Sequence, residues 1–193
     1  IEAVGKSIPA PTDGWNTLEP LANMKPEFAV RLINWFPTPG YVELRRGHIA
    51  HCDTASGLPV ETVLTYHGIT SNSMFAWSGA NIYDVTISTP STSVTGLGTA
   101  RSQGINFATT GGNFLWTCNG VDDPQYFDGS TWNVAAITGI SGPDIIGVNA
   151  HKNRLWFTQV DSSDAAYLPV DQIQGAAVPF PLGGLWNQGG YLM

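Results

Sequence analysis

The chain has 193 residues, enough for one large or two small domains, and only 12% of them are charged, whereas 22 are glycine and 13 are proline. This composition is typical of turn-rich β-proteins whose surfaces are polar through hydroxyl and amide groups. The formal net charge of −7 is concentrated in residues 54–193, where nine Asp or Glu outnumber three Lys or Arg, so the composition argues against a protein that grips nucleic-acid phosphates.

The first part of the chain, residues 1–53, predicts an extended arm followed by a β-hairpin. Residues 1–24 contain a Pro-Ala-Pro stretch that favours extended backbone, and they hold too few apolar side chains to fold alone. We therefore expect the arm to lie on a neighbour, in this chain or in another subunit. Residues 29–36, a turn at 37–40 and residues 41–47 predict the two strands of the hairpin.

Residues 54–193 predict β-rich repeats with a period of about 40 residues. Each repeat has a short β-type run, a strand that contains a tryptophan, a polar turn and a strand that contains a tyrosine. The residues that mark the period are Trp77, Trp116 and Trp156, with Tyr83, Tyr126 and Tyr167. The predicted repeats cover residues 60–90, 100–135 and 143–175.

The clearest repeat lies in residues 111–132, where aromatic and β-branched residues alternate with turn dipeptides such as Asn119-Gly120. We interpret this stretch as a complete β-hairpin. The Ser- and Thr-rich residues 88–98 are interpreted as a polar, low-complexity connection between the first two repeats.

The predicted fold class is all-β, with antiparallel β-propeller-like blades preceded by the arm and hairpin. Three or four strands in such a period are typical of a propeller blade, and the 3.6-residue periodicity of helical repeats is missing. An antiparallel sandwich with evenly spaced strands is the alternative. Three repeats cannot close a propeller, which needs about four to eight blades. The prediction is therefore an incomplete propeller, whose bare faces are covered by further chain or by other subunits.

The densest group of metal-binding residue types is His48, His51, Cys52 and Asp53. On a strand the two histidines point to opposite faces, and no second ligand pair lies nearby in sequence. We therefore predict no metal site. Cys52 and Cys118 have no CxxC spacing, so both are interpreted as small buried hydrophobic side chains and not as a disulfide. No signal peptide or membrane-spanning apolar run is predicted.

Five aspartates in the predicted turns are the candidates for carboxylate chemistry: Asp122, Asp123, Asp128, Asp161 and Asp164. Paired carboxylates are the machinery of glycoside cleavage. Aspartate is also favoured in turns because its side chain bonds the local backbone, and we prefer this structural role. The Asp-Asp-Pro stretch also lacks the ligand spacing of an EF-hand.

No other sequence motif nominates an active site. Ser102 and Ser141 lack the G-x-S-x-G context of a nucleophile elbow, and no Walker or dinucleotide-binding glycine motif occurs. We predict no catalytic, cofactor-binding or metal-binding residues and no enzymatic activity. The three repeated tryptophans are predicted to pack in the core between blades, with a platform that stacks on sugar rings as the alternative.

Several motifs together carry a resemblance to a known family: Asp13-Gly14-Trp15-Asn16, Leu21-Ala22-Asn23-Met24 with Pro26, Asn34-Trp35-Phe36-Pro37 with Pro39-Gly40, Val42, Leu44-Arg45 and Gly47, Asn81-Ile82-Tyr83-Asp84-Val85, Asn119-Gly120 with Asp122 and Pro124, Gly147-Val148-Asn149 with His151-Lys152-Asn153-Arg154-Leu155-Trp156-Phe157, and Gly189-Gly190-Tyr191-Leu192-Met193. They resemble structural proteins of tailed bacteriophages, in particular the tail nozzle or hub proteins of short-tailed phages. The motifs span nearly the whole chain and are structural, not catalytic.

The resemblance implies a virion protein of the phage tail, assembled in the host cytoplasm, that contains a β-propeller. It implies a homo-oligomeric ring, commonly sixfold, below the portal and adaptor, in contact with other tail proteins such as tail fibres. Phage DNA would cross the channel without tight binding, which agrees with the acidic repeats. Members of the family are longer than this chain. Arg45 and Arg46, at the end of the hairpin, are candidates for a salt link between subunits.

Two other functions remain open at this point. A carbohydrate-binding propeller that recognises host-surface glycans predicts an exposed tryptophan in a rim pocket, with Asp or Asn side chains converging on it. A propeller glycosidase predicts two carboxylates about 5 to 10 Å apart in a cleft.

Overall fold

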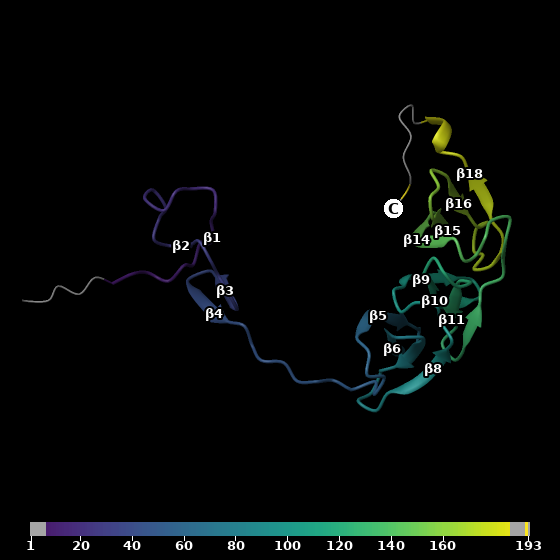
Figure 1. The fold of residues 1–193 in the computed structure, drawn as a ribbon, viewed down its shortest axis with the longest axis horizontal. Helices are drawn as coiled ribbons and strands as arrows, with labels where there is room; N and C mark the ends of the chain where they lie inside the picture. The colour runs from purple at the N-terminus through teal and green to yellow at the C-terminus, as the bar shows by residue number, and fades with distance from the viewer. Residues whose placement is uncertain (1–6, 186–191, 193) are drawn as a thin grey trace, which may run out of the picture. The chain divides into compact units, whose positions relative to one another are not determined.

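The computed structural model describes residues 7–185 and residue 192, and the chain divides into two compact units, Ile1–Ala50 and His51–Met193 (Figure 1). The described secondary structure is strand apart from one short 3-10 helix, η1 (Gly183–Leu185). The all-β, antiparallel part of the prediction is confirmed. No helix in the described part of the chain has the length and hydropathy needed to cross a membrane.

The N-terminal unit holds two small two-stranded sheets. Its strands are β1 (Gly14–Trp15), which pairs in parallel with β2 (Phe28–Ala29), and β3 (Trp35–Thr38), which pairs antiparallel with β4 (Tyr41–Leu44). The predicted hairpin is confirmed, but the strand predicted over residues 29–36 is wrong for most of its length. Asn34 has a φ of 60°, a left-handed conformation that interrupts a strand, so β3 begins only at Trp35.

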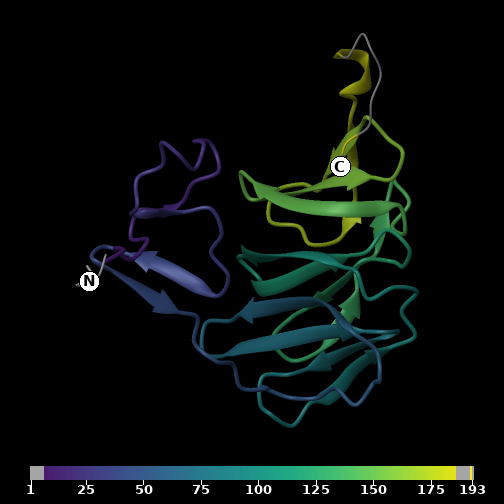
Figure 2. The same ribbon diagram turned by 60° about the vertical axis from the view of Figure 1, so that its left-hand side comes forward.

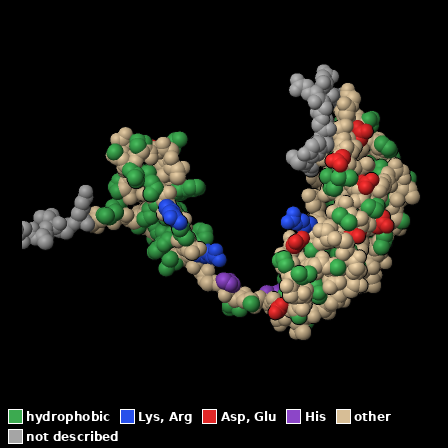
Figure 3. Space-filling model, in the orientation of Figure 1, with side chains coloured by type: hydrophobic (Ala, Val, Ile, Leu, Met, Phe, Trp, Pro, Cys, Tyr) green, Lys and Arg blue, Asp and Glu red, His purple; other side chains and the backbone are tan. Residues whose placement is uncertain are grey.

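The N-terminal unit buries almost none of its apolar side chains. Every buried hydrophobic residue of the described chain lies at Tyr66 or beyond, whereas Trp15, Trp35 and Phe36 are exposed. Hydrophobic side chains cover much of the visible surface of this unit (Figure 3). A unit of this size that buries so little apolar surface has a weak hydrophobic driving force of its own.

The second unit contains three four-stranded antiparallel sheets, called here the first, second and third sheets. The first sheet consists of β5 (Val60–His67), β6 (Asn72–Ser78), β7 (Asn81–Asp84) and β8 (Ser91–Thr95). The second consists of β9 (Gln103–Thr109), β10 (Gly112–Cys118), β11 (Gln125–Phe127) and β12 (Trp132–Val134). The third consists of β14 (Ile145–His151), β15 (Arg154–Gln159), β16 (Ala165–Tyr167) and β18 (Val178–Phe180).

In each sheet the strands lie side by side in the order in which they occur in the sequence. In the third sheet, the chain between β16 and β18 first forms β17 (Gly175–Ala176), which pairs in parallel with β13 (Ile137–Thr138) in a separate two-stranded sheet. The three sheets lie in successive layers within this unit (Figure 2). The last strand of the third sheet, β18, is an edge strand that carries Pro179, and proline is tolerated there because an N–H that faces away from the sheet has no ladder partner to lose.

Two predicted boundaries in the repeats are wrong. Residues 88–98 were expected to be a connection, but Ser91–Thr95 form β8, the fourth strand of the first sheet. Its Val94 packs against the core while the surrounding Ser and Thr side chains are exposed, as suits an edge strand. The third repeat was expected to end at 175, but its fourth strand, β18, follows the detour through β17.

Two hydrophobic clusters join the three sheets. Phe75, Trp77 and Leu115 belong to the cluster between the first and second sheets. Trp116 and Phe157 belong to the cluster between the second and third sheets. Because successive side chains of a strand point to opposite faces, the adjacent residues Leu115 and Trp116 fill the two clusters from the same strand. The second sheet is thus covered on both faces.

Two side-chain amides also connect the first two sheets at their neighbouring edges. Asn106 of β9 accepts a hydrogen bond from the His67 N–H at 2.9 Å and donates to the Thr65 carbonyl at 2.7 Å. Asn113 of β10 donates to the His67 carbonyl at 3.2 Å. These two amides satisfy three backbone groups near the end of β5, the Thr65 carbonyl and the N–H and carbonyl of His67.

Candidate functional site

A polar cleft of about 600 Å³ lies where the ends of β5, β9 and β14 come together. Its lining is contributed by all three sheets, through Glu61, Thr62, Arg101, Ser102, Gln103, Cys118, Asn119 and Ile146. Residues about 40 positions apart in the sequence meet here because the sheets repeat with that period. The cleft is the first of two candidate sites in this unit.

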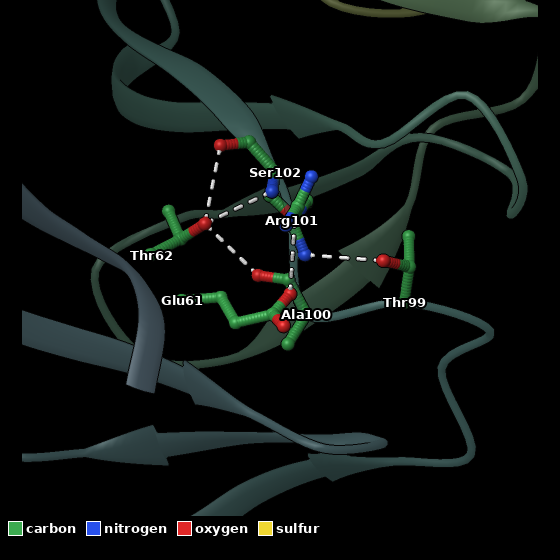
Figure 4. Close-up of polar contacts among 6 residues, drawn as sticks. All are labelled: Glu61, Thr62, Thr99, Ala100, Arg101 and Ser102. Carbon is green, nitrogen blue, oxygen red and sulfur yellow. Dashed lines mark hydrogen bonds and ion pairs between the residues drawn. The ribbon is translucent and has the colours of Figure 1, made fainter. Parts of the chain in front are cut away.

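Hydrogen bonds fix the backbone at the mouth of this cleft (Figure 4). The Thr62 hydroxyl donates to the Ala100 carbonyl at 2.9 Å and accepts from the Ser102 N–H at 3.0 Å. The Arg101 side chain projects from this anchored segment, with its Nε 3.6 Å from Glu61 Oε2. Both groups are solvent-exposed, so the ion pair itself contributes only about 0 to 1 kcal/mol. The arrangement holds one guanidinium beside one carboxylate at a fixed place.

The cleft contains no activated nucleophile among the residues that line it. Burial raises the pKa of the Cys118 thiol to about 12, so the thiol stays protonated and packs as a small hydrophobic group. Ser102 contributes its backbone N–H to Thr62. Neither Glu61 nor Arg101 was singled out from the sequence. The available signal was that Arg101 is one of only three cations in residues 54–193.

The second candidate site is the face of the third sheet that points away from the second sheet. We call it the aromatic face and define it by Arg154, Trp156, Tyr167, Val178 and Phe180. The ring centroids of Trp156 and Tyr167 are 4.7 Å apart, those of Trp156 and Phe180 are 5.5 Å apart, and the Arg154 guanidinium lies 5.1 Å from the Tyr167 ring. Phe180 and Val178 are exposed. This face is largely aromatic and carries one guanidinium, and Asn149 and His151 lie beside it as the cross-strand neighbours of Trp156 and Arg154.

The Trp156 indole N–H on this face is buried and has no hydrogen-bond partner among the residues that the structure describes. A buried donor without a partner costs about 1 to 3 kcal/mol. The corresponding N–H of Trp116, one repeat earlier, donates to the Ile173 carbonyl at 2.9 Å. The aromatic face therefore combines exposed apolar side chains with a buried N–H group that has no acceptor among the described residues.

The prediction for the repeated tryptophans is confirmed for two of three. Trp77 is 1% exposed and Trp116 is 0% exposed, each at an interface between sheets. Trp156 differs because it is half-buried. The physical reason is its position: it occupies the same place in the repeat, but no further sheet covers it within residues 7–185.

Two of the predicted turn aspartates, Asp122 and Asp164, accept hydrogen bonds from neighbouring loops. Asp122 accepts from the Gly98 N–H at 2.8 Å and from the Asn119 amide at 2.7 Å. Asp164 accepts from the Gly183 N–H at 3.1 Å. These bonds assign Asp122 and Asp164 a structural part in holding neighbouring loops together.

Asp128 caps the turn that follows β11. Its carboxylate accepts from the N–H groups of Ser130 and Thr131, both at 2.8 Å, from both of their hydroxyls and from the Asn133 amide. Gly129 in this turn has a φ of 101°, a conformation that glycine adopts without strain. Partial burial alone would raise the pKa of Asp128, but the hydrogen bonds outweigh burial and lower the pKa from 3.8 to about 2.

The variant Asp128→Asn is expected to be less stable than the wild type by about 1 kcal/mol at neutral pH, because it keeps the turn's shape but loses the charge. A depressed pKa stabilises the folded state above pH 3.8, and this stabilisation is lost as the pH falls through about 2. The difference between the two proteins in urea unfolding should therefore shrink over that range. Asp84→Asn, where the carboxylate accepts from one backbone N–H, is the control and should differ less. A difference that stays constant with pH would contradict the assignment.

The predicted histidine and cysteine group is engaged in structural contacts. His51 Nε2 lies 2.7 Å from the Val85 carbonyl, Asp53 accepts from the Ala55 N–H at 2.9 Å, and Cys52 packs against the cluster of Ala76, Tyr83 and Val85. Cys118 is buried as predicted, whereas Cys52 is only half-buried, and both are free thiols. Within the described ranges no three His, Cys, Asp or Glu side chains are grouped as metal ligands.

The two arginines proposed for a link between subunits lie at the end of the hairpin. Arg46 Nε is 3.3 Å from Glu43 Oε1 within the same hairpin. The Arg46 side chain is largely exposed, so this pair stabilises the hairpin little.

Comparison with known proteins adds no relative to this picture. No protein-family model, no curated protein and no solved structure matches the chain. The features of this chain that bear on its function are therefore its sequence motifs and the geometry of the two candidate sites.

Proposed function

We propose that this chain is a structural subunit of a bacteriophage tail, of the nozzle or hub type, without enzymatic activity. One observation carries the proposal: the N-terminal unit and the aromatic face, each taken by itself, expose large apolar side chains. Exposed apolar patches mark surfaces for contact with other proteins. A subunit of an assembly satisfies such surfaces when its neighbours are in place.

The three sheets of the second unit support assignment as blades of an incomplete β-propeller. Each has four antiparallel strands, and each packs face to face on the next through a hydrophobic cluster. Blades of this kind correspond to residues 60–95, 103–134 and 145–180. The aromatic face is where a fourth layer would pack.

The charge distribution supports a role in a DNA conduit. The second unit is strongly acidic, and its carboxylates are spread over its visible surface (Figure 3). A surface of this kind repels phosphates and lets DNA pass without adhesion. In the proposed virion the subunit forms a ring that extends the channel of the portal and adaptor, and it contacts other tail proteins such as fibres.

The test is the native mass of the purified protein, measured by light scattering alongside an intact-mass spectrum of the same chain. We expect a closed ring, since rings arise when one surface binds a different surface of the next copy, and about six copies because the family that the sequence resembles is commonly sixfold. A stable monomer of 20.6 kDa with an intact chain would count against the proposal.

Glycan binding is the second candidate, because one observation favours it. Trp156 and Asn149 are cross-strand neighbours and line a cleft of about 220 Å³ together with Gln103 and Thr158. Aromatic rings and amides are the groups that hold sugars. If this site binds host-surface polysaccharide, adding that polysaccharide should change tryptophan fluorescence in the wild type and not in Trp156→Ala. The glycosidase alternative lacks comparable support.

A further inference from the structure

In the first and second sheets, the repeated tryptophan points toward the next sheet along the chain. Trp77 packs in the cluster that the first sheet shares with the second. Trp116 packs in the cluster that the second shares with the third, where its ring stacks on Phe157 with centroids 5.0 Å apart. Trp156 occupies the same position in the third sheet. The aromatic face therefore continues an established series of interfaces between β-sheet layers.

The side chains of the aromatic face are suited to packing against a further β-layer. Trp156, Tyr167 and Phe180 already pack on each other edge to face or at a tilt, and Phe180 remains 43% exposed. The buried indole N–H of Trp156 has no acceptor within the described ranges. A covering β-layer brings both apolar side chains and backbone carbonyls, which are the two things that this face lacks.

A β-layer of matching chemistry lies in the N-terminal unit. In the β3–β4 hairpin, Phe36 is the cross-strand neighbour of Glu43 and Thr38 that of Tyr41, so these four side chains share one face. Phe36 is 54% exposed and Tyr41 is 56% exposed. This hairpin face is aromatic and carries the Glu43 carboxylate, which pairs with Arg46 within the hairpin, whereas the aromatic face carries one guanidinium, from Arg154. The two faces are both aromatic, and Glu43 is free to pair with Arg154 because its own pair with Arg46 is exposed and weak.

The length of the connecting chain favours a hairpin from a second copy. Six residues, Arg45–Ala50, follow the hairpin, and six extended residues span at most about 20 Å. From His51 the chain is attached to the first sheet through the Val85 carbonyl. The third sheet lies beyond the second, and stacked sheets are about 10 Å apart, so a hairpin of the same chain would have to pass around all three layers.

We propose that the aromatic face of one copy binds the β3–β4 hairpin of a second copy, with Glu43 of the hairpin opposite Arg154. This inference rests on the proposed ring of copies and identifies the two surfaces that are in contact between neighbouring copies. Each copy then binds one neighbour through its aromatic face and the other neighbour through its hairpin. Such a heterologous contact closes into a ring when the rotation between copies allows it.

Charge reversal tests the pairing without removing any apolar group. Glu43→Arg alone and Arg154→Glu alone are each expected to weaken association by about tenfold or more, and the double variant is expected to recover most of the loss. Association is measured as the concentration dependence of native mass. Arg101→Glu, a charge reversal at the cleft away from this face, is the matched control and should assemble like the wild type. Equal losses in the double variant and the single variants would overturn the pairing.

A second variant tests the apolar contact. Phe180→Asp should abolish assembly, with near-UV circular dichroism to show that the monomer remains folded, whereas Ile69→Asp, at an 88% exposed position in a turn of the first sheet, should not. If Phe180→Asp proves unfolded, Val178→Asp, also at an exposed position, replaces it. If the folded variant assembles normally while the wild type is oligomeric, this inference fails and the ring proposal stands. A monomeric wild type refutes both.

Photo-crosslinking identifies which copy supplies the hairpin. With benzoylphenylalanine in place of Phe36, the expected product has twice the mass of the chain and joins the hairpin to a peptide within residues 154–180. The same peptide crosslinked at the mass of a single chain would mean that the hairpin belongs to the same copy and would overturn the proposal. Crosslinks confined to other peptides would also overturn it.

Discussion

Replacing Trp116 with alanine is expected to lower the free energy of unfolding by about 3 to 5 kcal/mol. The side chain is fully buried between the second and third sheets and stacks on Phe157. Its indole also donates to the Ile173 carbonyl at 2.9 Å, so the change leaves both a cavity and an unpaired acceptor. Guanidinium unfolding followed by far-UV circular dichroism measures the difference.

Two controls separate packing from the hydrogen bond and from general effects of substitution. Trp116→Phe keeps an aromatic ring but removes the N–H, so we expect a smaller loss of about 1 to 3 kcal/mol. Val134→Ala, at an exposed position of β12, should change stability by less than about 0.5 kcal/mol. If Trp116→Ala cost no more than Val134→Ala, the interface between the second and third sheets would not contribute as described.

Phe75→Ala is the second substitution expected to have a large effect, about 3 to 5 kcal/mol, because it opens the cluster between the first and second sheets. Phe75 is 1% exposed, and its ring meets Phe127 at 4.7 Å and Trp132 at 5.0 Å, both edge to face. Edge-to-face pairs add about 0.5 to 1.5 kcal/mol beyond the burial of area.

A double-mutant cycle tests the aromatic pairing directly. Leucine variants of Phe75 and Phe127, which keep most of the buried volume, should show a coupling energy of about 0.5 to 1.5 kcal/mol in guanidinium unfolding. Phe75 and Phe157 belong to different clusters, so their leucine variants should be additive within about 0.5 kcal/mol. An equal coupling energy in both cycles would mean that the two hydrophobic clusters are energetically coupled, which would contradict their description as separate clusters.

The strands that the sequence predicted well are those with continuous runs of apolar and large aromatic residues. β6, β10 and β15 each contain a repeated tryptophan next to other apolar residues, and burial there is dictated by sheets on one or both sides. β8 was missed because an edge strand needs few apolar residues, and Val94 alone carried the signal. The detour through β17 was missed because its two residues are held by a pairing distant in sequence.

The candidate sites were less predictable, because both depend on how whole sheets are placed. Glu61 and Arg101 become neighbours only when the first and second sheets pack, and neither lies in a recognisable motif. Trp156 has the same local sequence signal as Trp116, so no local pattern distinguishes the half-buried ring from the buried one. What differs is the presence of a following layer, which is a property of tertiary structure.

Pro179 limits strand addition at the β18 edge of the third sheet, the outermost strand among the described residues. An edge strand with regularly spaced N–H and C=O groups is a template for strand addition, the route by which β-proteins form amyloid-like aggregates. Because Pro179 in β18 has no N–H, an incoming strand meets a gap in the pattern that it would copy. Growth through the edge is therefore discouraged while the sheet's face stays available, which favours assemblies of limited size over open-ended fibrils.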